Sequence, residues 1–266
     1  MTSKDPGTAP TRATEVSIEI NAPIEAVWKA LNDAEELTRW FPLEAGVNPD
    51  GTVWMSWGSD FRFEGKPEIV EPPHRLRTTA GPGPMATDVF LEARGGKTVL
   101  RLVQSGFGPG AEWDSELDAT HRGWIFQLRG LKHYLEVHRG TPRCVAWARK
   151  LISLAPEEAW QKLVRDGGLV TEGSLDGLKQ GNAFRIRMAT GDTFEGEVAA
   201  NDAPLSFAAI TRNWNRALLQ IRFDDLPLRG YRDVNLWLST YGVAEAEVRA
   251  LENRWKALLD RLFPAA

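Results

Sequence analysis

The sequence has few of the residues that carry metal, thiol or phosphate chemistry. One residue of 266 is cysteine, Cys144, so the chain cannot form an internal disulfide. The four histidines are dispersed along the chain, and no metal-ligand spacing appears, so no metal site is predicted. Neither of the two glycine-rich phosphate-binding patterns occurs, and no cofactor is expected.

Long apolar runs and an excess of positive charge are also missing. No stretch of about 18 apolar residues is present that would span a bilayer as a helix. Residues 1–14 lack the apolar segment of a secretion signal, so we expect a cytoplasmic protein. The formal net charge of −4 argues against an extended surface for nucleic acid or an anionic membrane. Neither is expected as a partner.

Tryptophan is the residue type in excess, with 11 Trp against 3 Tyr. Large apolar rings at this frequency indicate thick cores or apolar cavities, and composition does not decide between the two. With 42% hydrophobic and 26% charged residues, the chain is typical of a globular protein that buries a core. Its length suits two domains of about 100–150 residues.

The first half opens with a strand followed by two helices. Residues 14–20 alternate apolar and polar side chains, the pattern of a half-buried strand. Pro23 ends the strand, and residues 24–31 place apolar side chains at helical spacing. Asp33, with Glu36 three residues later, predicts the capped start of a second short helix.

Five strand-like runs and a long helix follow. The runs are residues 51–57, 61–71, 75–80, 86–94 and 97–105. Short turns between consecutive runs imply an antiparallel meander. The helix is marked by an apolar stripe that steps by three and four residues and is predicted to face the sheet: Leu117, His121, Trp124, Leu128, Leu131 and Leu135.

The same pattern then restarts. Phe63-Glu64-Gly65 recurs 131 residues later as Phe194-Glu195-Gly196, and the same offset carries Pro73 to Pro204. Residues 144–153 repeat the first strand, and a second long apolar stripe closes the chain: Val248, Leu251, Trp255, Leu258, Leu259 and Leu262. The sequence therefore predicts an α+β fold of two tandem modules, residues 14–139 and 144–266, each an antiparallel sheet curved around a long C-terminal helix.

Four segments of the first half resemble a known family. They are residues 18–31 (IEINAPIEAVWKAL), 37–40 (LTRW), 63–76 (FEGKPEIVEPPHRL) and 123–135 (GWIFQLRGLKHYL). They are similar to the SRPBCC superfamily (START-like, Bet v 1-like), in the group named for the activator of Hsp90 ATPase homologue 1. The second half matches more loosely, through A-P-E-E-A-W at 155–160 and its last helix, and looks like a diverged copy.

The resemblance implies a helix-grip fold in tandem, often with an apolar ligand cavity between sheet and helix. Six side chains of the first module are candidate ligand contacts: Trp40, Trp57, Trp113, His121, Trp124 and Leu128. Trp113 lies in the loop before the helix, at the expected mouth. Trp57 shares a strand face with Met55, whereas Trp54 lies on the opposite face.

His121 is the polar member of this set, and three interpretations of it stay open. It is a packed histidine satisfied by a backbone group or strand hydroxyl, a donor to a ligand, or a general acid or base. No carboxylate partner is fixed by its spacing, and no other catalytic constellation appears in the sequence. No catalytic residue is therefore assigned.

Because the superfamily includes lipid carriers, hormone receptors, polyketide cyclases and co-chaperone domains, the fold alone does not identify the activity. The first hypothesis is a protein that binds a small apolar or amphipathic ligand. The second is a co-chaperone-like module that contacts a protein partner such as a chaperone through its surface. The third is a polyketide cyclase-like enzyme.

Overall fold

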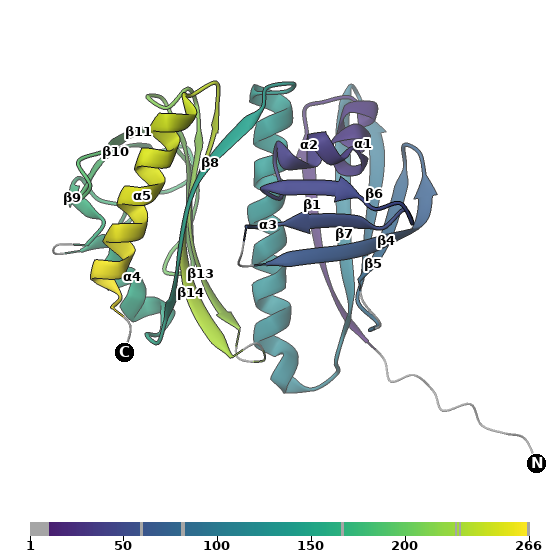
Figure 1. The fold of residues 1–266 in the computed structure, drawn as a ribbon, viewed down its shortest axis with the longest axis horizontal. Helices are drawn as coiled ribbons and strands as arrows, with labels where there is room; N and C mark the ends of the chain where they lie inside the picture. Colours follow the sequence, from purple (N-terminus) through teal and green to yellow (C-terminus); the bar gives the residue numbers. More distant parts are fainter. Residues whose placement is uncertain are drawn as a thin grey trace, which may run out of the picture. The chain divides into compact units, whose positions relative to one another are not determined.

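The computed structural model describes residues 11–58, 61–80, 83–165, 168–226, 228 and 230–264. The chain divides into two compact units, Met1–Glu136 and Val137–Ala266. Each unit has one seven-stranded antiparallel sheet and a long C-terminal helix (Figure 1). The predicted fold class, two tandem α+β helix-grip modules, is confirmed.

The first unit follows the predicted order of elements, and its sheet has the order β1-β7-β6-β5-β4-β3-β2. The sheet is a meander except that the first strand pairs with the last. Strand β2 was not predicted, because it is short and has no alternating pattern. The elements are β1 (Arg12–Ile20), α1 (Ile24–Asn32), α2 (Ala34–Thr38), β2 (Glu44–Val47), β3 (Val53–Ser56), β4 (Arg62–Glu71), β5 (Arg75–Ala80), β6 (Ala86–Arg94), β7 (Lys97–Phe107), the 3-10 helix η1 (Ala111–Trp113) and α3 (Asp114–Val137).

The second unit repeats this topology, with the sheet order β8-β14-β13-β12-β11-β10-β9. The turns before Pro73 and Pro204 match in detail, because both contain a cis peptide bond at the proline. The predicted internal repeat is therefore confirmed. The elements are β8 (Arg143–Ile152), α4 (Pro156–Val164), β9 (Val170–Glu172), β10 (Ala183–Met188), β11 (Thr193–Asp202), β12 (Ser206–Thr211), β13 (Leu218–Leu226), β14 (Tyr231–Tyr241) and α5 (Glu245–Leu262).

Helix α2 is short, and two hydrogen bonds define its start and its docking. The backbone N–H of Glu36 donates to Asp33 Oδ1 at 3.0 Å, which is the predicted N-terminal cap. The Glu36 side chain does not turn back to the cap. It accepts a hydrogen bond from the Tyr134 hydroxyl of α3 at 2.6 Å, so it ties α2 to α3.

Two cations complete this buried contact. Lys29 Nζ and Arg39 Nη1 lie 3.1 Å and 3.2 Å from Glu36 Oε1. Burial opposes ionisation of Glu36, but the hydrogen bonds from Tyr134 and Lys29 and the charge of Arg39 outweigh it, so the pKa of Glu36 is lowered. Close approach of the two helices also depends on Gly130, where a Cβ would lie 3.2 Å from the Trp40 carbonyl oxygen.

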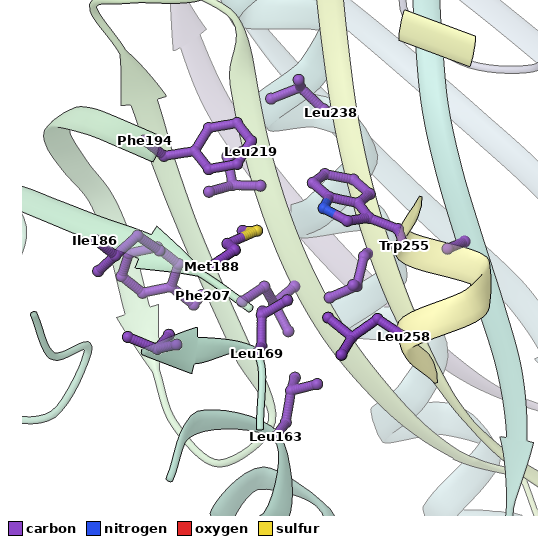
Figure 2. Packing of buried hydrophobic residues seen from close by; sticks show 14 of the residues in the cluster. Leu163, Leu169, Ile186, Met188, Phe194, Phe207, Leu219, Leu238, Trp255 and Leu258 are labelled. Carbon is purple, nitrogen blue, oxygen red and sulfur yellow. The ribbon is translucent and has the colours of Figure 1, made fainter. Parts of the chain in front are cut away.

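The second unit has a continuous apolar core between its sheet and α5. Trp255 of α5 is fully buried, and Figure 2 shows its indole facing Phe194, Leu219 and Leu238 from three strands of the sheet. Phe194 lies 6.1 Å from Trp255, measured between ring centroids. These large side chains meet at the centre of the unit.

We predict that Tyr134→Phe destabilises the first unit by about 1.5–3 kcal/mol, because a buried carboxylate loses a hydrogen bond. Hydrogen–deuterium exchange, followed by peptide in the full chain, should speed up in the first unit and stay unchanged in peptides of the second. Equal acceleration in both units, or in neither, would contradict the prediction.

The same network predicts a pH dependence. The pKa of Glu36 is lowered in the folded state. The ionised carboxylate therefore stabilises the first unit above the unfolded-state pKa of about 4.3, and this stabilisation is lost as the pH falls through the folded-state pKa. In Tyr134→Phe the loss should begin at higher pH, because the folded pKa rises. Denaturation at a series of pH values measures this, and Glu36→Gln, which has no group to titrate, is the control.

Candidate functional site

A row of polar side chains crosses the inner face of the first sheet. The strand register places Thr14 of β1 opposite Gln104 of β7, Gln104 opposite Thr87 of β6, and Thr87 opposite Thr78 of β5. Directly opposed residues on neighbouring strands lie on one face, so these four form a line. We call Thr14, Gln104, Thr87 and Thr78 the inner row.

Helix α3 contacts the inner row through two side chains one turn apart. His121 Nδ1 lies 2.9 Å from the Thr14 hydroxyl, and Trp124 Nε1 donates to Gln104 Oε1 at 2.5 Å. Thr14 is buried, whereas His121, Trp124 and Gln104 are half-buried. Both predicted residues therefore face the sheet, and each has a polar partner in the row.

Several polar atoms at this site have no partner among the residues that the structure describes. Among the described residues, none forms a hydrogen bond with His121 Nε2 or Gln104 Nε2. The hydroxyls of Thr87 and Thr78 likewise have no partner in the described part of the chain. Half-buried donors and acceptors of this kind are satisfied by water or by a ligand.

Three aromatic rings pack together, and one of them, Trp124, contacts the inner row. Phe41 follows α2, and its ring centroid lies 5.2 Å from that of Trp57 and 5.6 Å from that of Trp124. We call Phe41, Trp57 and Trp124 the aromatic wall. Trp40, which also follows α2, stacks on Phe41 with the ring centroids 5.0 Å apart. The end of α2 therefore sets the position of Phe41 in the wall. The site thus combines apolar rings with unpaired polar groups.

The remaining three predicted ligand contacts lie in different surroundings. Trp40 is 3% exposed, and its indole N–H donates to the Ala30 carbonyl oxygen at 2.8 Å. Leu128 is 1% exposed. Trp113 packs edge-on against Phe107 at 6.3 Å, in the loop before α3. The structure therefore brings Trp57, Trp124 and His121 together, and the ligand contacts of all six residues stay predictions.

Sequence reasoning missed Gln104 and Phe41. Gln104 lies at the end of a predicted strand and has no local feature that marks it, because its partners come from three other elements. Phe41 directly follows Trp40, so only the helix end decides which ring faces the site. Pairing the predicted strands in register would have identified Gln104 as the neighbour of Thr14.

The second unit offers an internal comparison for the inner row. The 131-residue offset carries Thr78 to Ala209, and the second sheet's register continues from Ala209 to Leu219, then Leu238, then Ala146. All four are fully buried apolar residues. The same offset carries Trp124 to Trp255. The second unit therefore keeps the tryptophan and replaces every polar side chain of the row.

The described part of the chain has neither a metal-binding cluster nor a membrane-spanning helix. No group of three or more His, Cys, Asp or Glu side chains there is arranged to hold a metal ion. No helix in the described ranges combines the length and the apolar character that crossing a bilayer demands.

Comparison with known proteins gives one family match, to the first unit. Residues 21–136 match the family described as "Activator of Hsp90 ATPase homolog 1-like protein", which confirms the resemblance found in the sequence. No curated protein matches the chain.

Solved structures that resemble this chain include some that match about half of it and some that match nearly all of it. The Aha1 dimer from Colwellia psychrerythraea is 20% identical, with a TM-score of 0.42, and covers 48% of this chain and 99% of its own. DynU16, "a putative protein in the dynemicin biosynthetic locus", is 20% identical, with a TM-score of 0.42, and covers 94% and 96%. The "di-domain ARO/CYC BexL from the BE-7585A biosynthetic pathway" is 15% identical, with a TM-score of 0.42, and covers 96% and 99%.

We predict that Phe41→Leu destabilises the first unit by about 1–3 kcal/mol, because each aromatic pair contributes about 0.5–1.5 kcal/mol beyond its burial. The control is Phe61→Leu. Phe61 is 48% exposed and packs on Trp57, so its change should stay within about 0.5 kcal/mol. Peptide-resolved hydrogen exchange compares the variants, and equal effects would refute the central position of Phe41.

Proposed function

We propose that the first unit, whose residues 21–136 match the Activator of Hsp90 ATPase homolog 1-like family, binds a small amphipathic molecule between its sheet and α3. The aromatic wall would contact the apolar part of the ligand. His121 and the inner row would orient its polar part. Ligand sites typically combine mostly apolar walls with a few placed polar groups, and this site has that composition.

The observation that carries the proposal is the contrast between the two inner faces. Both units fold with the same sheet order and a tryptophan at the same place on the last helix. The second unit fills this level with Ala146, Leu238, Leu219 and Ala209, all fully buried. Since the fold forms with an apolar row, the polar row of the first unit serves something other than folding.

Binding is favoured over acid–base catalysis by the partner of His121. That partner is the hydroxyl of Thr14, whereas a histidine that acts as a base is usually oriented by a carboxylate. The threonine hydroxyl holds the ring in place. The arrangement suits a hydrogen bond between His121 Nε2 and a ligand.

The experiment is a titration of the full chain with fluorescent fatty acids and polyphenols. We expect saturable binding, weakened about tenfold by His121→Leu through the loss of one hydrogen bond, and weakened by Trp57→Ala through the loss of the wall. Trp54→Ala is the matched control. Trp54 lies on the outer face of β3, where Arg62 Cζ is 4.5 Å from the centroid of its ring. Absence of saturable binding by every ligand would overturn the proposal.

A further inference from the structure

The orientation of the Gln104 amide is determined by chemistry as well as by distance. An indole N–H can donate a hydrogen bond but cannot accept one. The Gln104 atom that lies 2.5 Å from Trp124 Nε1 must therefore be the carbonyl oxygen. Trp124 thus fixes which end of the amide faces α3, and Nε2 with its two N–H groups is directed elsewhere.

The amide nitrogen has no acceptor in the described part of the chain. On one side of it in the row, the Thr14 hydroxyl is already engaged with His121. On the other side lies Thr87, directly opposite Gln104 in the sheet register. Gln104 therefore presents two unpaired donors from the middle of the inner row. A half-buried donor without a partner is unfavourable unless water or a ligand oxygen accepts from it.

A ligand that accepts from Gln104 Nε2 also reaches the aromatic wall. The ring that holds Gln104 in place, Trp124, is also a member of the wall, 5.6 Å from Phe41. A group that accepts from Gln104 Nε2 is therefore attached to a body that lies against rings. Flat, conjugated molecules pack best on such surfaces.

The second unit has the same fold without a glutamine at this level. In the second unit Leu238 takes the place of Gln104, and the corresponding Trp255 Nε1 is buried without a hydrogen-bond partner among the described residues. The tryptophan is thus kept where the glutamine is lost. Gln104 is not present merely to satisfy an indole N–H.

We infer that Gln104 is a specificity-determining residue, and that it selects planar aromatic ligands carrying a carbonyl-type acceptor oxygen over the same ring system without one. This inference rests on the proposed ligand site. Trp124 acts on specificity through Gln104, as a positioning residue, and also as a wall of the site.

The test compares 9-fluorenone with fluorene, which share a planar skeleton and differ in one carbonyl oxygen. We expect the full-length protein to bind fluorenone about tenfold more tightly, the effect of one hydrogen bond. Gln104→Leu should abolish this preference, so that the two compounds bind with equal affinity. Gln104→Glu should abolish it as well, because a carboxylate still accepts from Trp124 but has no N–H to donate.

The matched control is Ser105→Ala, at the next residue of β7, which strand alternation turns to the opposite face. It should keep the preference for fluorenone. Equal binding of the two compounds, or a preference that survives Gln104→Leu, would overturn the role of Gln104 and leave the ligand site standing. If neither compound binds, and the fatty acids and polyphenols also fail, the proposed function itself falls and this inference with it.

Discussion

The site depends first on the register of the strands β1, β7, β6 and β5. A sheet exposes alternate residues on each face, so a slip of one residue would send a whole strand's inner side chains to the outer face. With the observed register, Thr14, Gln104 and Thr87 line up beneath α3. The hydrogen bond between His121 and Thr14 and the one from Trp124 to Gln104 then hold the helix to this level of the sheet. The chemistry of the site is therefore a consequence of backbone pairing between segments far apart in the chain.

A second constraint places the aromatic wall against this row. Phe41 comes three residues after the end of α2, and α2 is bound to α3 by Glu36 and Tyr134. Glu36 is buried, but the hydrogen bonds from Tyr134 and Lys29 and the charge of Arg39 lower its pKa. Its carboxylate therefore stays charged. A buried charge with several partners is strongly directional, so α2 has one docked position. The position of Phe41, and with it the spacing of the rings, follows from that contact.

The sequence was sufficient for the fold because the relevant signals are local or repeated. Alternation in residues 14–20, the cap at Asp33 and the offset between Phe63 and Phe194 all describe elements that the structure contains. Prediction was weaker for the site, since its members are joined by strand pairing. Gln104 has no local mark, and its importance appears only when Thr14 and Trp124 are placed around it. The strand β2 was missed for a related reason, because four residues with a central glycine have no distinct period.

The two units differ in how they use one tryptophan. In the second unit, an indole N–H without a partner costs about 1–3 kcal/mol, while burying a leucine in place of a polar side chain contributes about 1.5–3 kcal/mol. The two effects nearly cancel, so an apolar row at this level is compatible with a stable fold. The same balance applies to the first unit, where leucine in place of Gln104 would gain burial and lose one hydrogen bond, with little net effect on folding. Gln104 is only half-buried, and its two amide N–H groups have no acceptor among the described residues. A polar residue that contributes little to stability and lies beside an aromatic wall supports the proposed ligand site.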